Sequence, residues 1–387
     1  MTVAYLISNY HGSSTGAGGH YYSLKTMAEA MGQRHEVLTV SVGQEVPKPF
    51  RNIPAHVHVK ASLFWQERAI GSLLSLFRSR GVRVIHSYDV ASSYLGYVLA
   101  TLLKVPFFLT KCGGPRPRSF FPKIPHLFVF HMADFDFFRK LPRLSETKVE
   151  LLPHRVNPPV YDEERAGRIF GKKPEGQIAF FRIGRIGEAY KHSVQSAMEL
   201  VEKARSVGVQ GHLYIIGHVQ SEKVLAGLKE RASEWVTFVT EPENTVNASE
   251  LLGFSDAVIG TGRGFIEALA SKKVVFFPVQ NERLPRLASE WTFPHAFQEN
   301  FSERVTLPET CLRQDDDLVF LNDCHWQSEV GEWGYRVYKE NFDAAVGSER
   351  LCAAYESASP AVLRGFMSSL LLHRVSLFCL GLLNKLR

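Results

Sequence analysis

The chain has few cysteines, and they lack the spacing of a disulfide framework or of a structural zinc site. Five cysteines occur in 387 residues, without a Cys-x-x-Cys pair and without a histidine at metal-ligand spacing. They are Cys112, Cys311, Cys324, Cys352 and Cys379. An odd number of scattered cysteines is explained most simply by a reducing compartment, and no metal site is expected.

A hydrophobic run long enough to cross a bilayer is also missing. The apolar C-terminal segment, residues 360–387, is interrupted by Arg364, His373 and Arg374, so its longest uncharged run falls short of the roughly 20 residues required. This segment either lies in the plane of a membrane interface or forms a helix that packs back on the first domain.

The N-terminus lacks the features of a signal peptide. No basic residue precedes the apolar residues 3–7, and Ser8 and Asn9 interrupt them, which indicates a first buried strand. We therefore expect a protein located in the cytoplasm or at the inner face of the cell membrane.

The charge balance favours an anionic partner. The net charge is +6 and the isoelectric point is near 9.0, which suits a nucleotide, a phospholipid surface or nucleic acid. Charge alone does not choose among these three. Nucleic acid is the poorest choice, because the sequence contains no recognised nucleic-acid-binding module.

The first half of the chain has the pattern of a doubly wound α/β domain. Short β-branched or aromatic runs alternate with segments whose apolar residues recur every three or four positions. The predicted strands are residues 3–9, 36–42, 82–88, 106–112, 126–131 and 149–153. The predicted helices include residues 21–32, 67–81 and 91–104. Strands that alternate with helices in this way indicate a mostly parallel sheet.

The same alternation restarts after residues 153–177, which are rich in proline, glycine and charged residues. The predicted strands of the second half are residues 178–184, 212–217, 236–240, 256–262 and 274–279, and its helices include 192–208 and 221–233. The predicted boundaries are 1–160 for the first domain, 161–174 for a linker, 175–330 for the second domain and 331–387 for C-terminal helices. Ligands of such sheets bind at the carboxyl ends of the strands, which can face each other across a cleft.

A glycine-rich stretch, Gly16 to Gly19, lies between the first predicted strand and the first predicted helix. Gly16 and Gly18 fit the start of a dinucleotide fingerprint, but Tyr21 occupies the third glycine position and no acidic residue ends the second strand. A nicotinamide site is therefore disfavoured. The loop either brings backbone N–H groups close to a phosphate or sugar or simply forms a tight turn.

Residues 182–193 place Arg182, Arg185 and Lys191 around two glycines at the end of the first strand of the second half. A positive cluster at the mouth of a cleft would neutralise the developing charge of a leaving diphosphate. The alternative is a solvated basic loop. The position at the carboxyl end of a strand favours the functional interpretation.

Residues 256–273 repeat this arrangement. A strand runs into Gly260 and Gly262, and a helix is predicted to begin near Gly264, so its free N–H groups and positive dipole would point into the cleft. Glu267 is predicted in the first turn of this helix. Its carboxylate either accepts hydrogen bonds from two hydroxyl groups, as a ribose would offer, or complements the helix dipole.

Four stretches together resemble the retaining glycosyltransferases of family 4, which have the GT-B fold of two Rossmann-like domains that face each other across a cleft. The resemblance covers most of residues 1–305. It is carried by "GAGGHYYSLKTMAEAMGQRHEVLTVSV", "LLPHRVN", "FRIGRIGEAYK" and "GTGRGFIEALASKKVVFFP", in the family's order and spacing. The family would make residues 1–160 the acceptor-side domain and residues 175–330 the nucleotide-sugar domain.

The resemblance implies a set of site residues. Arg185, Lys191 and Glu267 would act in catalysis, the two cations on the donor diphosphate and the glutamate on the ribose. The donor nucleotide-sugar would also contact Gly18, Gly19, Gly262, Arg263, Gly264 and Phe265. No metal or other cofactor is expected, because arginine and lysine can neutralise the leaving group. A retaining enzyme of this kind can use the departing phosphate as the base for the acceptor hydroxyl.

Several positions depart from the family pattern. Ile259 stands where family members commonly carry a first glutamate, eight positions before Glu267. Cys112 replaces a histidine after the fourth strand, and His154 and Arg155 replace an Asn-Gly pair. The spacing from Arg185 to Lys191 is one residue longer than usual. A subgroup with a Gly-Thr-Gly-Arg…Glu-Ala segment and a later Asn-Phe-Ser resembles this chain, which has "ENFSERV" at residues 299–305.

The acceptor is expected to be a glycan or a lipid-linked molecule. Basic and aromatic residues mix in the stretch 111–131, which suits either a membrane interface or an anionic acceptor, or is simply a basic surface loop. They are Lys111, Arg116, Arg118, Lys123, Phe120 and Phe121. Four residues at or after strand ends are candidates to contact acceptor or sugar, although a purely local role is more common for each. They are His11, His20, Asp89 and Lys111.

The sequence therefore predicts a nucleotide-sugar-dependent, retaining glycosyltransferase that builds a bacterial surface polysaccharide or glycolipid. Two alternatives stay open. One is a sugar-nucleotide epimerase or hydrolase on the same fold, and the other is a non-catalytic GT-B binding partner in a polysaccharide assembly complex, which Ile259 and Cys112 would permit.

Overall fold

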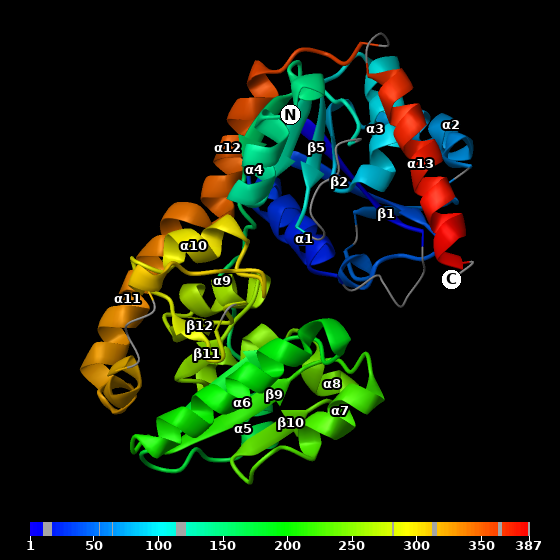
Figure 1. Ribbon diagram of the computed structural model, residues 1–387. Helices are drawn as coiled ribbons and strands as arrows, with labels where there is room; N and C mark the ends of the chain where they lie inside the picture. Colours follow the sequence, from blue (N-terminus) through cyan, green and yellow to red (C-terminus); the bar gives the residue numbers. More distant parts are fainter. Residues whose placement is uncertain are drawn as a thin grey trace. The chain divides into compact units, whose positions relative to one another are not determined.

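The computed structural model describes residues 1–10, 18–53, 55–63, 65–113, 121–280, 282–311, 316–362 and 366–385 (Figure 1). The chain divides into two compact units. The first combines residues Met1–Arg155 with Ala344–Arg387, and the second is Val156–Asp343. The last part of the chain thus returns to the unit that contains its beginning.

The first unit is built on a parallel sheet in the order β3-β2-β1-β4-β5-β6-β7. Its strands are β1 (Thr2–Asn9), β2 (Glu36–Gly43), β3 (His56–Lys60), β4 (Val82–Ser87), β5 (Phe107–Lys111), β6 (His126–Val129) and β7 (Lys148–Leu151). The order reverses between β1 and β4, as in a doubly wound fold. The sequence analysis missed β3 and predicted the other strands.

Helices cover both faces of this sheet, and alternate residues of β1 point to opposite faces. The helices are α1 (Gly19–Gly32), α2 (Ile70–Ser79), α3 (Val90–Leu103), α4 (Met132–Arg139), α12 (Ala344–Ser357) and α13 (Met367–Lys385). Tyr5 and Ile7 share a hydrophobic cluster with α1 and α12, whereas Ala4 and Leu6 share another with α2, α3 and Leu370 of α13. The C-terminal helices therefore complete the first unit's two cores.

His86 ties α12 to the middle of the sheet. It is fully buried in β4, and its ring nitrogens lie 2.6 Å from the hydroxyl of Tyr355 on α12 and 2.7 Å from the hydroxyl of Thr110 on β5. Burial lowers the pKa of His86 to about 3, so the ring stays neutral.

The second unit has a sheet in the order β10-β9-β8-β11-β12-β13, in which β13 is antiparallel. Its strands are β8 (Ile178–Ile183), β9 (Gly211–Ile216), β10 (Val236–Val239), β11 (Ala257–Ile259), β12 (Val274–Phe277) and β13 (Arg286–Leu287). Its helices are α5 (Glu163–Phe170), α6 (Lys191–Ser206), α7 (Glu222–Lys229), α8 (Pro242–Thr245), α9 (Arg263–Ala270), α10 (Phe293–Gln298) and α11 (Cys324–Asn341).

Short 3₁₀ turns connect several of these elements. They are Lys48–Phe50, Gln66–Ala69, Pro142–Leu144, Glu188–Tyr190, Ala248–Phe254, Glu309–Cys311 and Asp316–Asn322. Together, the two parallel-sheet units and their covering helices confirm the predicted doubly wound α/β class.

Residues 161–174, which the sequence analysis assigns to a linker, contain α5. Phe170 at its end packs its ring against Phe181, Tyr214 and Phe254, with ring centres 4.7 to 5.1 Å apart. This helix thereby contributes to the core of the second unit. At the other boundary, α11 belongs to the second unit, whereas α12 and α13 belong to the first.

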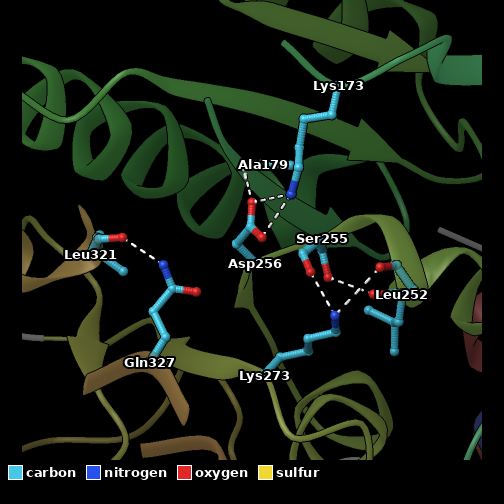
Figure 2. Close-up of polar contacts among 9 residues, drawn as sticks. Lys173, Ala179, Leu252, Ser255, Asp256, Lys273, Leu321 and Gln327 are labelled. Carbon is cyan, nitrogen blue, oxygen red and sulfur yellow. Dashed lines mark hydrogen bonds and ion pairs between the residues drawn. The ribbon is translucent and has the colours of Figure 1, made fainter. Parts of the chain in front are cut away.

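A network of polar contacts holds the amino ends of β8 and β11 together (Figure 2). The carboxylate of Asp256 accepts hydrogen bonds from the N–H of Ala179 and from Lys173, each 2.8 Å long. Lys273 donates to the carbonyl of Ser255 at 2.7 Å. This network fixes the amino ends of β8 and β11. It therefore also determines where the carboxyl ends of the two strands lie.

Candidate functional site

Two glycine-rich loops leave the carboxyl edge of the second unit's sheet side by side. β8 and β11 are parallel neighbours, paired through Ala257 with Phe180 and through Val258 with Phe181. The start of α9 also lies close to the end of β8, because a Cβ atom added to Gly264 would lie 3.7 Å from the carbonyl oxygen of Ile183. The two stretches that the sequence analysis singled out in this half of the chain are thus adjacent in the fold.

The loop after β8 is closely packed against the loop after β9. A Cβ atom on Gly217 would lie 1.5 Å from the carbonyl oxygen of Gly184, so only glycine fits this contact. Backbone hydrogen bonds continue the pairing, from Gly184 to Ile216 and from Ile186 to His218, each 3.0 Å long. The loop that carries Arg185 therefore has a defined path.

Arg182, which the sequence analysis places in a positive cluster at the mouth of a cleft, is 1 % exposed. Its guanidinium donates to the carbonyl of Ile183 at 2.6 Å and to the hydroxyl of Ser193 at 2.8 Å. Burial lowers the pKa of Arg182 to about 10, and the carboxylate of Glu303 acts in the opposite direction. Arg182 is therefore a buried cation that is still protonated at neutral pH.

Arg185 is exposed and rests on Tyr190. Its guanidinium carbon lies 4.6 Å from the centre of the Tyr190 ring, and one of its nitrogens donates a hydrogen bond to the Tyr190 hydroxyl. Desolvation lowers the pKa of Arg185. Lys191 is the first residue of α6 and is exposed. The structure thus brings both predicted cations to the same loop and helix start.

The turn before α9 depends on Gly260 and Gly262. Gly262 has φ 51° and ψ −122°, a conformation that residues with a side chain rarely adopt. A Cβ atom on Gly260 would lie 2.6 Å from the Cα atom of Phe265. These two positions let the chain reverse sharply, so that α9 begins at Arg263.

Residues Asn300 and Phe301 support this turn from the opposite side. The N–H of Gly262 donates to the carbonyl of Phe301 at 3.1 Å, and the rings of Phe265 and Phe301 stack with centres 4.1 Å apart. Asn300 and Phe301 both have positive φ values, 54° and 53°, which is costly for residues other than glycine. The Asn-Phe-Ser stretch noted in the sequence therefore adopts an unfavourable backbone conformation and packs against the glycine turn.

Glu267 is the fifth residue of α9 and is 9 % exposed. Its Oε1 accepts a hydrogen bond from the Nε of Arg263, one turn earlier, at 2.7 Å. Phe265 is fully buried, so only its backbone is placed for ligand contact. The predicted residues Gly262, Arg263 and Gly264 thus lie at the start of α9. Glu267 lies one turn further on and not in the first turn, because the helix begins at Arg263.

The helix starts at this edge differ from other helix starts of the second unit. Among its described helices of eight or more residues, α5, α7 and α11 are capped by the side chains of Asp162, Ser221 and Asp323. α6 and α9 have no side-chain cap. At both starts the backbone itself supplies acceptors, since the N–H of Lys191 donates to the carbonyl of Glu188 and that of Gly264 to the carbonyl of Thr261. The positive end of each helix dipole still favours an anion such as a phosphate.

Gly18 and Gly19 belong to the first unit, not to the unit that holds the other predicted site residues. Gly18 precedes α1 in an extended conformation without a side-chain cap, and Gly19 begins the helix. His11 and Gly16, like Arg116, Arg118 and Phe120, lie outside the described residues.

Asp89 has a local role in the first unit. One of its carboxylate oxygens accepts from the N–H and the hydroxyl of Ser8 at 2.6 and 2.8 Å, and the other accepts from the N–H of Ser92 at 2.7 Å. Asp89 therefore caps α3 and joins it to the end of β1. Burial lowers the pKa of His20, with Asp89 acting in the opposite direction.

Lys111, the last residue of β5, and Cys112, the residue after it, also have partners within the first unit. Lys111 Nζ lies 2.6 Å from the carboxylate of Asp134, which is 1 % exposed and also lies 3.3 Å from His131. The Cys112 thiol faces the carbonyl of Tyr88 at 3.5 Å, and burial raises the pKa of Cys112. Phe121, predicted in a basic-aromatic surface stretch, is 5 % exposed and packs on Phe138 in the core.

Metal-binding clusters and membrane-spanning helices are absent from the described ranges. No three His, Cys, Asp or Glu side chains gather there in a way that would hold a metal ion. No helix in that part of the chain has both the length and the apolar character needed to traverse a bilayer.

Comparison with known proteins identifies the fold. No protein-family model matches the chain, and no curated protein matches it in sequence. Solved structures do match. A glycosyltransferase from Rickettsia africae gives a TM-score of 0.62 at 15 % identity and covers 92 % of this chain and 97 % of that one.

Two further structures agree with this match. HepE from Anabaena, in complex with UDP, gives a TM-score of 0.62 at 11 % identity over 92 % of this chain and all of that chain. Sucrose-phosphate synthase from Thermosynechococcus elongatus gives 0.61 at 14 % identity over 92 % and 98 %. At such identities the likeness shows the fold alone: the chain has the predicted GT-B fold, with two Rossmann-like units and a helical C-terminal segment.

Proposed function

We propose that this protein is a glycosyltransferase that moves a sugar from a nucleoside-diphosphate sugar to a glycan or lipid-linked acceptor. One observation carries the proposal. Two helix starts without side-chain caps, α6 and α9, follow adjacent strands through glycine loops and have cations close by in the chain. Such an edge suits a diphosphate, because helix dipoles and positive side chains at the same sheet edge both favour an anion.

Each predicted residue has a place in this proposal. Arg185 and Lys191 bind the donor diphosphate, together with the backbone of residues 262–265 at the start of α9. Glu267 accepts hydrogen bonds from the ribose hydroxyls with the carboxylate oxygen that Arg263 leaves available. Solved structures of the same fold support the ligand class, since HepE has been crystallised with UDP and with UDP-glucose.

The chemistry that we propose needs no side-chain nucleophile and no metal. The acceptor hydroxyl oxygen forms a bond to the anomeric carbon, and the bond from that carbon to the diphosphate oxygen breaks. The leaving diphosphate takes the hydroxyl proton and keeps the electron pair of the broken bond. Arg185 and Lys191 stabilise the charge that develops on the diphosphate. Attack on the face that the diphosphate leaves gives retention of configuration, as in the family 4 enzymes that the sequence resembles.

The experiment that tests this function measures binding first and turnover second. UDP, GDP, ADP and dTDP are titrated into the protein by calorimetry, and we expect one of them to bind with micromolar affinity. The matching nucleotide sugar is then incubated with and without glycan and lipid-linked acceptors from bacterial surface polysaccharides. Transfer with retained anomeric configuration, read by NMR, would support the proposal.

The same assay separates the alternatives. Donor turnover without an acceptor would indicate a hydrolase or epimerase. Nucleotide binding without any turnover would indicate a non-catalytic partner in a polysaccharide assembly complex. Ile259 is compatible with this alternative, because it is fully buried in β11 and no carboxylate stands at that position. Failure of all four nucleotides to bind would contradict the proposed function.

Contact with the cytoplasmic face of a membrane is a further part of the proposal. Leu372 and Val375 on α13 are 72 % and 58 % exposed, and Trp65 is 60 % exposed. Arg374 joins the two segments by donating to the carbonyl of Leu63 at 3.0 Å and to the carboxylate of Glu67. Exposed leucine, valine and tryptophan suit the interfacial zone of a bilayer.

Vesicle sedimentation tests this contact. We expect the protein to sediment with vesicles that contain phosphatidylglycerol, and Leu372→Glu to weaken sedimentation strongly. Val160→Glu is the control, because Val160 is 83 % exposed in the other unit. Equal sedimentation of both variants would argue against α13 as the contact.

A further inference from the structure

Arg182 is the start of a chain of contacts that ends at Arg185. Its guanidinium bonds to the carbonyl of Ile183 at 2.6 Å and to the hydroxyl of Ser193 at 2.8 Å. A Cβ atom on Gly184 would lie 2.3 Å from its Nη1 atom. The guanidinium thus packs directly against the loop that leads to Arg185.

Ser193 passes this contact on to Tyr190. Its hydroxyl donates to the carbonyl of Tyr190 at 3.0 Å, and Ser193 is fully buried in the first turn of α6. An arginine can only donate hydrogen bonds, so Arg182 leaves the serine proton free to turn toward that carbonyl. The buried cation therefore fixes the direction of the second hydrogen bond.

Tyr190 in turn holds Arg185. The Arg185 guanidinium lies over the Tyr190 ring and donates to its hydroxyl, and Tyr190 is the residue immediately before α6. A contact of a cation with an aromatic face and a hydrogen bond from the same group fix both the position and the plane of the guanidinium. Arg182, Ser193, Tyr190 and Arg185 are therefore linked without a gap.

The burial of Arg182 indicates that this chain of contacts has a function. Removing a guanidinium from water is costly, and an aliphatic side chain would fill the end of β8 without that cost. Arg182 is too deeply buried to serve as a ligand contact itself. We infer that Arg182 is a positioning residue that acts through Ser193 and Tyr190 to hold Arg185 in the place where it binds the donor diphosphate, an inference that rests on the proposed function.

A thermodynamic cycle tests this inference with the full chain. Ser193→Ala breaks the middle contact with little change of volume, and its effect on UDP and pyrophosphate affinity is measured with and without Arg185→Ala. We expect Ser193→Ala to weaken binding about five- to tenfold in the wild-type background and less than twofold in the Arg185→Ala background. A purely structural role of Ser193 would weaken binding equally in both.

Ser196→Ala is the matched control. Ser196 lies in the same helix, is 2 % exposed and donates to the carbonyl of Ser193 at 3.2 Å without touching Tyr190. It should leave affinity unchanged in both backgrounds. If Ser193→Ala does not fold, Tyr190→Phe tests the last contact, because it removes only the hydroxyl, and we expect it to weaken binding only while Arg185 is present.

A second readout does not depend on ligand binding. The NMR signal of the Arg185 Nε–H group, assigned by its loss in Arg185→Lys, should sharpen and move toward that of free arginine in Ser193→Ala but not in Ser196→Ala. Equal losses in both backgrounds, or an unchanged NMR signal, would overturn the inference and leave the proposed function standing. A wild-type protein that binds neither UDP, the other nucleotides nor pyrophosphate would overturn the proposed function, and the NMR result would then decide whether the positioning chain exists.

Discussion

The Arg185 guanidinium lies over the ring of Tyr190, with its carbon 4.6 Å from the ring centre. A planar cation held in this way presents its free N–H groups in one plane at the mouth of the glycine loop. Because a diphosphate offers pairs of oxygens at matching spacing, this geometry favours two parallel hydrogen bonds over a single charge contact.

The first prediction follows from this geometry. Arg185→Lys keeps the charge but loses the planar fork and much of the contact with Tyr190, so we expect UDP affinity to fall about tenfold, and further in Arg185→Ala. Arg205→Lys is the control, because Arg205 lies over the Trp235 ring at 5.9 Å in the last turn of α6. Titration calorimetry measures the effect, and equal affinity of Arg185→Lys and wild type would show that charge alone matters at this position.

The second prediction concerns the ribose contact that we propose for Glu267. Replacement by Gln removes the charge from a carboxylate that is 9 % exposed, and hydrogen bonds to charged groups contribute about 1.5 to 3 kcal/mol. We expect UDP affinity to fall roughly 10- to 100-fold, whereas pyrophosphate, which has no ribose, should bind as before. An equal loss for both ligands would place Glu267 at the diphosphate instead. Glu222→Gln, in the first turn of α7, is the control.

Much of the fold could be predicted because its central strands carry a continuous signal. β1, for example, is buried along its whole length and is apolar over most of it. β3 has no such signal. His56 and His58 alternate with its two valines, and both rings bond to the hydroxyl of Ser41 on β2 at 2.8 Å. An edge strand stabilised by polar neighbours can be recognised only after its partner strand is known.

The candidate site could be predicted in part for a similar reason. Arg185 and Gly262 stand out because they follow strands, and parallel strands bring their carboxyl ends to one edge. Tyr190 and Ser193 carry no signal of their own. Their role becomes visible only through their contacts with the buried Arg182. The sequence analysis assigns Arg182 to the positive cluster at the cleft mouth, although this residue lies within the predicted strand 178–184.

The third prediction tests the close contact between the loops after β8 and β9. Gly217→Ala would place a Cβ atom 1.5 Å from the carbonyl oxygen of Gly184, so the loop that carries Arg185 must move. We expect a lower melting temperature and at least tenfold weaker UDP binding. Gly227→Ala is the control. Gly227 lies within α7, where an added Cβ meets nothing within 4 Å, so stability should be unchanged or rise by up to about 1 kcal/mol. Wild-type binding by Gly217→Ala would mean that the loop tolerates a shift.

The fourth prediction concerns acid stability of the first unit. The pKa of His86 is lowered by burial to about 3, and that of His56 to about 4, so the unfolded chain binds protons that the folded chain does not. Stability should therefore be full above about pH 6.5 and decrease as the pH falls toward 3, by up to roughly 1.4 kcal/mol per pH unit for His86. His86→Gln should lower stability at pH 7, because it disturbs the contacts with Tyr355 and Thr110, but should flatten the decrease.

Hydrogen exchange of the β4 and α12 amides between pH 4 and 7, corrected for the intrinsic exchange rate, measures this local stability. His325→Gln is the control, since that side chain on α11 is 80 % exposed and should leave the pH dependence unchanged. The curves of wild type and His86→Gln should converge as the pH falls, because the opened wild-type chain takes up a proton at His86 that the folded chain does not, whereas glutamine does not titrate. Parallel curves would show that His86 does not couple α12 to the sheet through its neutral ring.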